Sequence, residues 1–269
     1  REHAVHLMHP RDYRTMFTFW WNGAAIAGTT DLDHAPELER EYAEPFASLE
    51  EIDYIIEALQ FTFPHLGIKR EDILSTMAGL RPVINTGKAR PSDESRAHAI
   101  WEEEGLLTIT GGKWTTYRRM AQDTVDLAIT VGGLKRRPCP TEQMPIHGWV
   151  EASDDADPLH AYGADAPGIR RLIAARPELG KRLHGALPYL RAEVVWGVRR
   201  EMARTVEDVL ARRTRALFLN ARASVEMAKE TAALMAAELG RDEAWQAEQV
   251  ARYKALAAGY LPSLKGGPI

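Results

Sequence analysis

Hydrophobic residues at the start of the chain form a pattern that predicts two strands. Residues 15–21, TMFTFWW, are aromatic and β-prone, and residues 24–27 form a second apolar run. Asn22 and Gly23 stand between them, and both tolerate the positive φ that a type I′ turn needs. We therefore expect a β-hairpin whose second strand leads into the sequence Gly28-Thr29-Thr30-Asp31.

A helix is predicted after this hairpin. Ser48 and Glu51 have the spacing of a capping box, in which each residue caps a backbone N–H of the other. Apolar residues then recur at helical intervals from Ile52 to Phe63. Pro64 should end the helix, because proline lacks the N–H that a helix interior uses.

Two further strands are expected on either side of a loop. The run from Ile73 to Ile84 is strand-like and contains Ala78-Gly79-Leu80-Arg81-Pro82. Residues 85–94 are rich in Gly, Pro, Ser and charge, which is typical of a loop. Residues 106–110, LLTIT, predict a short buried strand.

A helix should follow that strand directly after Gly111-Gly112. Met120, Thr124, Leu127 and Val131 mark one of its faces, and Gly132-Gly133 should close it. The predicted unit is strand, Gly-Gly, helix.

Beyond Pro138-Cys139-Pro140 the pattern is helical almost throughout. We expect an α+β protein, with a partial mixed-sheet piece over residues 1–137 and an all-helical domain over residues 138–269. Three apolar stripes at helical spacing carry this expectation: Val194, Val198, Met202, Val206 and Val209; Val225, Ala228, Ala232, Met235 and Leu239; and Trp245, Gln249, Tyr253, Leu256 and Tyr260.

Charge and cysteine content narrow the class of protein. The net charge is −4, whereas nucleic-acid binding usually shows as a basic excess, so we expect no nucleic-acid partner. The one cysteine, Cys139, excludes a disulfide within the chain and is expected to be a small packed side chain. No run approaches the roughly 18 apolar residues of a membrane span.

The segment Gly111-Gly112-Lys113-Trp114-Thr115-Thr116 is the first candidate for chemistry. A helix that begins after glycines presents unsatisfied N–H groups and a partial positive charge, and a ligand can approach the glycine backbone closely. Lys113 adds a full positive charge. The segment is thus a candidate seat for an anionic or electron-rich group, or only a turn. It is not a G-x-G-x-x-G fingerprint, and the sequence contains none.

Arg81 is the second candidate. It follows small and apolar residues and precedes Pro82, and an arginine on a buried strand is costly unless an anion pairs with it. Its guanidinium could form a fork for a carboxylate or phosphate. An internal salt bridge, or a position at a strand end that reaches solvent, explains it equally well.

Arginines are dense along the predicted helix from Ala192 to Arg213. The pairs Arg204–Asp208 and Asp208–Arg212 fall four residues apart, where opposite charges on a helix meet. A self-paired solvated face is one interpretation, and an interface with another domain, subunit or anionic lipid is the other. The histidines, by contrast, show no metal-binding spacing.

Four of these segments resemble ordered motifs of the FAD-dependent glycerol-3-phosphate dehydrogenases. They are Gly28-Thr29-Thr30-Asp31, Ala78-Gly79-Leu80-Arg81-Pro82, the run from Gly111 to Arg118, and the helical run from Glu201 to Arg215. The resemblance extends over about residues 1–261. It implies oxidation of sn-glycerol 3-phosphate to dihydroxyacetone phosphate, with hydride transfer to FAD and electrons passed to quinone.

The resemblance also assigns roles to the candidates. It implies that Arg81 holds the substrate and that Lys113 lies near the substrate phosphate and the flavin. It implies that the backbone of the segment Gly111, Gly112, Lys113, Trp114, Thr115 and Thr116 lies against the flavin ring. The family's proposed catalytic histidine, which precedes a Pro-Arg pair, is not in this sequence, where Arg1 matches that arginine.

We therefore expect this chain to be the C-terminal half of such an enzyme, inactive without an N-terminal FAD-binding half. From the family we expect a cytoplasmic location, peripheral at the inner face of the membrane. A homodimer is also compatible with the family resemblance. A glycerol-3-phosphate oxidase, which passes electrons to oxygen, would look similar. A non-catalytic helical interaction module is the alternative from another class.

Overall fold

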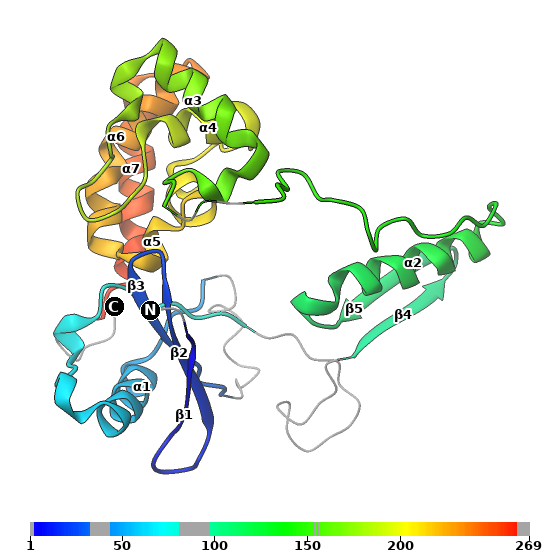
Figure 1. Ribbon diagram of the computed structural model, residues 1–269, viewed down its shortest axis with the longest axis horizontal. Helices are drawn as coiled ribbons and strands as arrows, with labels where there is room; N and C mark the ends of the chain where they lie inside the picture. The colour runs from blue at the N-terminus through cyan, green and yellow to red at the C-terminus, as the bar shows by residue number, and fades with distance from the viewer. Residues whose placement is uncertain (1–2, 33–43, 81–96, 153, 155, 263–269) are drawn as a thin grey trace. The chain divides into compact units, whose positions relative to one another are not determined.

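The computed structural model describes residues 3–32, 44–80, 97–152, 154 and 156–262 (Figure 1). These residues pack as two compact units. The first holds the described residues within 1–30, 44–79 and 150–269, and the second holds those within 31–43 and 80–149. The units are therefore not consecutive halves of the chain, and the boundary expected at residues 137 and 138 stays a prediction.

The first unit begins with a three-stranded antiparallel sheet. Its strands are β1 (Val5–Met8), β2 (Thr15–Trp21) and β3 (Ala24–Gly28), in the order β1-β2-β3 (Figure 1). The predicted hairpin is confirmed, since Trp21 pairs with Ala24 across the turn. Asn22 and Gly23 have φ values of 46° and 89°, as a type I′ turn requires.

The predicted helix is α1 (Leu49–Thr62), and its capping box is confirmed. The Ser48 hydroxyl accepts from the N–H of Glu51, and the Glu51 carboxylate accepts from the N–H of Ser48. Pro64 opens a 3-10 turn, η2 (Pro64–Leu66), so the α-helix ends where proline was expected to end it. A small core of Leu7, Met16 and Ala58 joins α1 to the sheet.

The strand expected from residue 73 is wrong over its described part, residues 73–80, which follow the 3-10 turn η3 (Arg70–Asp72). The backbone of this segment bonds to the helical domain, by which we mean the described residues from 156 to 262. The N–H of Ala221 donates to the carbonyl of Leu74 at 3.0 Å. The N–H of Thr76 donates to the carbonyl of Tyr260 at 2.8 Å. Since helix ends supply these partners, no strand is needed to satisfy the backbone.

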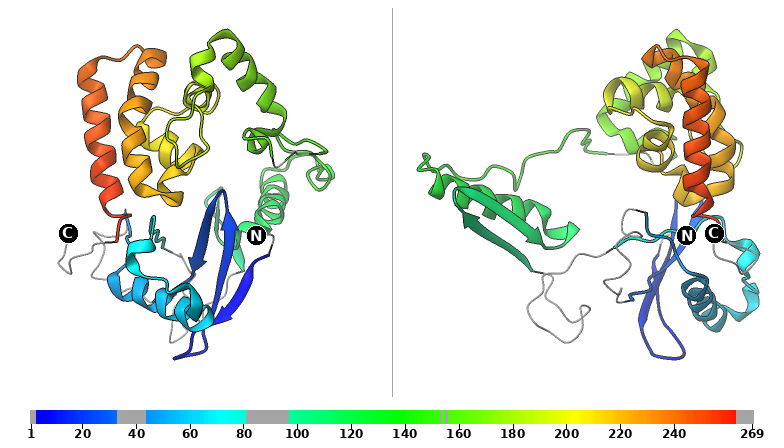
Figure 2. Two further views of the ribbon diagram at one scale, coloured as in Figure 1. Left: turned by 60° about the vertical axis from the view of Figure 1, so that its left-hand side comes forward. Right: turned by 180° about the vertical axis from the view of Figure 1, so that it is seen from behind.

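The helical domain has two long helices side by side, α6 and α7 (Figure 2). The apolar stripes predicted for them are confirmed, since Ala228, Ala232, Met235 and Tyr253 are buried in one core. The elements in chain order are η6 (His160–Asp165), α3 (Ala166–Ala175), η7 (Pro177–Gly180), α4 (Arg191–Arg200), η8 (Asp208–Arg213), α5 (Ala216–Leu219), α6 (Ala221–Leu239) and α7 (Glu243–Ala258).

The N-terminal hairpin shares the core of the helical domain. Ala24 is buried in it, and Trp21 packs against it. The guanidinium of Arg215 lies over the Trp21 ring, 5.6 Å from its centroid, where a cation is attracted to the aromatic face. The hairpin and the helices thus form one compact unit although many residues separate them in the sequence.

The prediction of a single helix from Ala192 to Arg213 is wrong, because the helix is interrupted between α4 and η8. Met202 has a φ of 55° and is 76% exposed, so it leaves the apolar stripe to which it was assigned. A new helical segment starts near Thr205, where the Asp208 carboxylate accepts from the N–H groups of Arg204 and Thr205 at 2.9 and 3.0 Å. The Thr205 hydroxyl accepts from the N–H of Asp208 in return, so Thr205 and Asp208 form a capping box that the expectation of one continuous helix had missed.

The arginines of this region are paired within the domain. Arg199 donates to Glu238 and Arg213 to the carbonyl of Glu201. Arg212 reaches Asp208 at 3.2 Å, as predicted. Arg204 departs from its predicted pair, because its guanidinium donates to the carbonyls of Val198 and Ala203 instead. These contacts favour the self-paired interpretation, and the alternative of an interface stays a prediction.

The second unit contains the predicted strand, Gly-Gly and helix. Strands β4 (His98–Glu103) and β5 (Leu106–Gly111) form an antiparallel hairpin, and α2 (Tyr117–Val131) follows (Figure 1). Gly132 caps α2, as expected. The strand is not buried as predicted, since Leu106 is 67% exposed. With antiparallel sheets and a helical C-terminal domain, the predicted α+β class is confirmed.

Candidate functional site

The turn between β5 and α2 depends on two glycines with positive φ. Gly111 and Gly112 have φ values of 75° and 85°, a region that other residues enter only at a cost. A Cβ on Gly112 would also lie 2.3 Å from the Sδ atom of Met120, which is far inside van der Waals contact. Glycine at 112 is thus favoured by the left-handed backbone, and any larger residue would also make the flexible end of the Met120 side chain shift.

Lys113 lies at the start of the helical segment that follows. Its backbone is extended, and a 3-10 turn, η5 (Trp114–Thr116), precedes α2. The N–H of Lys113 donates to the Thr116 hydroxyl at 3.3 Å, and that hydroxyl donates to the Lys113 carbonyl at 3.0 Å. The N–H groups of a first helical turn have no partner within the helix, so this end carries a partial positive charge beside the lysine.

The side chains of this segment are open to solvent. Lys113, Trp114, Thr115 and Thr116 are all exposed, and Trp114 is 87% exposed. The Trp114 ring stacks on Tyr117 with centroids 5.5 Å apart. The arrangement offers an accessible, positively polarised and partly aromatic face that can receive an electron-rich ring or an anion.

Behind the turn, β4 and α2 are joined by polar side chains. His98 Nε2 lies 3.2 Å from Asp123 Oδ2, and the other oxygen of Asp123 pairs with Arg119 Nε at 2.9 Å. Sequence reasoning missed His98 and Asp123. The pairing of His98 with Gly111 in the ladder depends on the turn at Gly105, and a hairpin prediction there would have revealed it.

Cys139 lies in the chain after α2 and is half-buried. Its thiol lies 3.0 Å from the Thr141 hydroxyl, and this hydrogen bond lowers the pKa of the Cys139 thiol. Arg118 also donates to that hydroxyl, at 3.2 Å. The side chain is thus only partly buried, so the packing role predicted for it stays a prediction.

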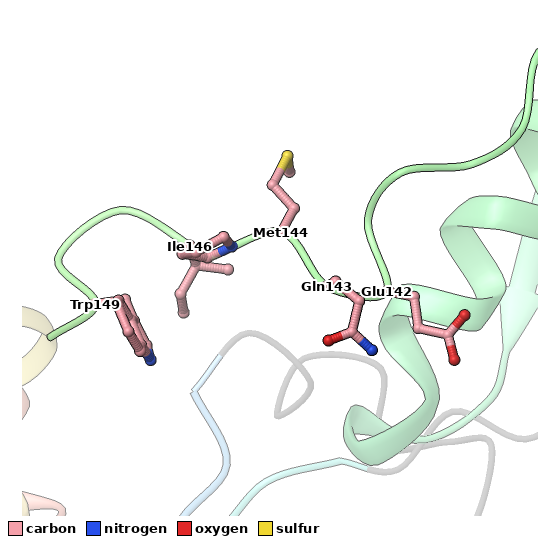
Figure 3. Close-up of a pocket in the computed structure, with 6 residues that line it drawn as sticks. Glu142, Gln143, Met144, Ile146 and Trp149 are labelled. Carbon is pink, nitrogen blue, oxygen red and sulfur yellow. The ribbon is translucent and has the colours of Figure 1, made fainter. Parts of the chain in front are cut away.

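An open hollow of about 460 Å³ lies beside the chain just beyond (Figure 3). A single loop lines it, and none of the predicted site residues contributes to it. The lining residues are Glu142, Gln143, Met144, Pro145, Ile146 and Trp149.

Arg81 lies outside the described residues, so its proximity to Lys113 stays a prediction. The motif Gly28-Thr29-Thr30-Asp31 begins at the last residue of β3, and the Thr30 hydroxyl donates to the Glu51 carboxylate at 2.6 Å. Among the described residues, no group of three His, Cys, Asp or Glu side chains could hold a metal ion.

Comparison with known proteins gives consistent results. A family described as the C-terminal domain of alpha-glycerophosphate oxidase matches residues 107–246. A mitochondrial glycerol-3-phosphate dehydrogenase of Arabidopsis thaliana is 33% identical over 91% of the chain, and the Homo sapiens protein of that name is 34% identical over 89%. The chain spans only 43% and 35% of the lengths of these two relatives.

A solved structure also resembles the chain. It is the glycerol-3-phosphate dehydrogenase from Bacillus halodurans in complex with FAD, at 26% identity and a TM-score of 0.73. The similarity covers 99% of the chain and 55% of that protein.

Proposed function

The chain belongs to the FAD-dependent glycerol-3-phosphate dehydrogenase and oxidase family, and on this premise we propose that it is the C-terminal part of an enzyme that oxidises sn-glycerol 3-phosphate to dihydroxyacetone phosphate. The observation that carries the proposal is the match over residues 107–246, which includes the Gly-Gly turn and Lys113. The remaining length of the relatives would supply the rest of the flavin site.

The exposed start of η5 fits the flavin ring. Lys113 and the first N–H groups of the helical segment form a donor set suited to an electron-rich edge, and the side chains around them are exposed. FAD, when bound, supplies a hydride acceptor. Lys113 and these N–H groups would orient the ring and stabilise negative charge on it.

Arg81 is proposed to hold the substrate phosphate or hydroxyls. A planar guanidinium can donate two parallel hydrogen bonds and fix the orientation of the substrate, which lysine cannot do. Lys113 would add a second positive charge, close to both substrate and ring.

The proposal includes quinone as the electron acceptor, a homodimer, and a cytoplasmic location with peripheral attachment to the inner face of the membrane. Its support is the family resemblance. Among the described residues, no helix combines the length and apolarity of a bilayer crossing. An oxidase that uses oxygen is the second candidate, because the matching family is described as the C-terminal domain of alpha-glycerophosphate oxidase.

The test uses the longer polypeptide that carries this chain together with the rest of the family's length. The purified protein should hold FAD and oxidise sn-glycerol 3-phosphate, and steady-state rates with a quinone analogue and with oxygen distinguish the two acceptors. Arg81→Lys and Arg81→Ala should lose roughly 30- to 1000-fold in kcat/KM while FAD stays bound. Arg170→Lys, which alters an arginine paired with Asp157, serves as the control.

Normal kcat/KM in a destabilised Arg81→Ala protein would end the proposed role of Arg81. Lys113→Ala should instead change the flavin spectrum as well as substrate use. The 269-residue chain alone should bind FAD weakly or not at all, because its sequence holds no G-x-G-x-x-G fingerprint. Tight binding in a flavin fluorescence titration would contradict this expectation.

A further inference from the structure

His98 and Asp123 connect β4, the strand paired with β5, to α2, the helix that follows the Gly-Gly turn. His98 lies on β4 directly opposite Gly111, the last residue of β5. Its Nε2 atom lies 3.2 Å from the Asp123 carboxylate on α2. The hairpin before the turn is therefore tied, through β4, to the helix after it.

The Asp123 carboxylate is itself held in place. Its second oxygen pairs with Nε of Arg119 at 2.9 Å, one helical turn earlier. Asp123 thus has one partner on its own helix and one on β4. Because both oxygens have a partner, these contacts favour the rotamer that ties α2 to β4 at this point.

Gly112 is enclosed by the same two elements. A Cβ at this position would lie 2.3 Å from Sδ of Met120 on α2 and 3.4 Å from Cβ of His98 on β4. The turn therefore packs against both elements, and a change in the angle between the hairpin and the helix would move it. Lys113 follows at once, so its direction depends on that angle.

From this geometry we propose that His98 and Asp123 are positioning residues, which fix the Gly111-Gly112 turn and so aim Lys113 and the first N–H groups of the helical segment at the flavin. The inference rests on the proposed function. Neither residue needs to touch FAD or substrate, because each acts through the turn.

Burial separates this role from simple stabilisation. Both side chains are half-buried, and a pair that remains open to water contributes about 1 kcal/mol or less to stability. A displacement of about 1 Å at a reacting group can nevertheless cost up to roughly 100-fold in rate. The effect of the pair on catalysis should thus exceed its effect on stability.

The experiment compares His98→Ala, Asp123→Ala and the conservative His98→Gln, whose amide can still donate to Asp123. Glu103→Gln is the matched control, because Glu103 accepts from Trp101 Nε1 at 3.3 Å at the far end of the same hairpin. In the 269-residue chain, hydrogen exchange is followed at the amides of residues 111–116. In the longer flavoprotein, the flavin absorption spectrum, kcat and KM are measured.

The two alanine variants should raise exchange at the turn and lower kcat by roughly 10-fold with little change in KM, and they should shift the flavin spectrum. His98→Gln should restore most of each property, and Glu103→Gln should change none. Unaltered exchange and spectrum in both alanine variants, or equal changes in Glu103→Gln, would overturn the inference.

A wild-type protein without FAD or activity would instead overturn the proposed function and the catalytic part of this inference. The exchange data on the 269-residue chain would then decide separately whether the pair fixes the turn, so the two failures are distinguishable.

Discussion

The hydroxyl of Tyr162 donates a 2.8 Å hydrogen bond to the buried carboxylate of Glu193. The other oxygen of that carboxylate accepts from the N–H of Leu190 at 2.6 Å, at the start of α4. Burial raises the pKa of Glu193 to about 7, although both hydrogen bonds oppose the rise, and the nearby Glu201 adds to it. A carboxyl group that titrates near neutral pH thus lies inside the helical domain, between η6 and α4.

The helical domain should consequently lose stability as the pH rises toward and above neutrality. The ordinary pKa of glutamate is 4.5, so between 4.5 and about 7 the folded state binds more protons at Glu193 than the unfolded state does. The contribution of Glu193 to stability is fully present below pH 4.5, the ordinary pKa. It is lost as the pH rises through about 7, the pKa in the folded state. We expect the free energy of unfolding to fall by on the order of 2–3 kcal/mol between about pH 4.5 and pH 8, relative to a Glu193→Gln variant.

Urea unfolding of both proteins at several pH values measures this difference. Glu226→Gln is the control, because Glu226 is exposed and pairs with His184 at the surface. Parallel pH profiles for wild type and Glu193→Gln would contradict the expectation.

Asp208 should prove important as a helix cap. Its carboxylate accepts from the N–H groups of Arg204 and Thr205. The N–H of Asp208 in turn donates to the Thr205 hydroxyl at 3.1 Å. Asp208→Ala should cost about 1–2 kcal/mol in the free energy of unfolding, as loss of an N-terminal cap usually does. Arg212→Ala removes only an exposed partner of Asp208 and should cost far less. Equal losses in the two variants would assign the effect to the ion pair.

Local signals in the sequence predicted the elements that depend on local chemistry. Asn22-Gly23, Ser48 with Glu51, and Gly132 each specify a turn or cap through nearby backbone groups, and the structure has them as expected. The segment from residue 73 could not be predicted in this way. Its backbone partners are Ala221 and Tyr260, which lie far along the chain, and β-propensity alone cannot reveal them.

The candidate site was predictable to the same extent. Glycines before a helix indicated a turn open to a ligand, and the structure has Gly111 and Gly112 at positive φ with Lys113 exposed behind them. A hairpin prediction at Gly105 would have placed His98 opposite Gly111, but its contact with Asp123 was not predictable, because a strand residue and a helix residue meet there only through tertiary packing. The role of these residues toward flavin comes from family resemblance, since hydrophobic periodicity carries no information about it.

Gly168 should tolerate no side chain, although alanine is the better helix former. A Cβ at this position in α3 would lie 2.5 Å from a ring carbon of the buried Trp196. A packed indole cannot move aside as a flexible chain can, so Gly168→Ala should destabilise the domain by roughly 1–3 kcal/mol. Gly185→Ala is the control, since nothing lies within 4 Å of the Cβ it would add. Thermal unfolding measures both, and a higher Tm for Gly168→Ala would show that helix propensity outweighs the clash.

Gly112 and Gly105 allow the two reasons for glycine at the candidate site to be separated. Both have a φ of +85°, but only Gly112 has neighbours within 4 Å of an added Cβ. Gly105→Ala should therefore cost the backbone strain alone, roughly 1–2 kcal/mol. Gly112→Ala should cost slightly more, because the flexible end of the Met120 side chain must also shift to admit the new Cβ. Hydrogen exchange of the β4–β5 ladder amides in the 269-residue chain reports both losses.

Met120→Ala in the Gly112→Ala background tests this division. Removal of the thioether leaves room for the new Cβ but does nothing for φ, so the double variant should recover only the steric part of the loss. Met120→Ala alone supplies the third corner of the cycle, since it carries its own cost in lost packing. If the losses were simply additive, the contact with Met120 would not explain why position 112 is glycine, and the left-handed backbone would remain as the reason.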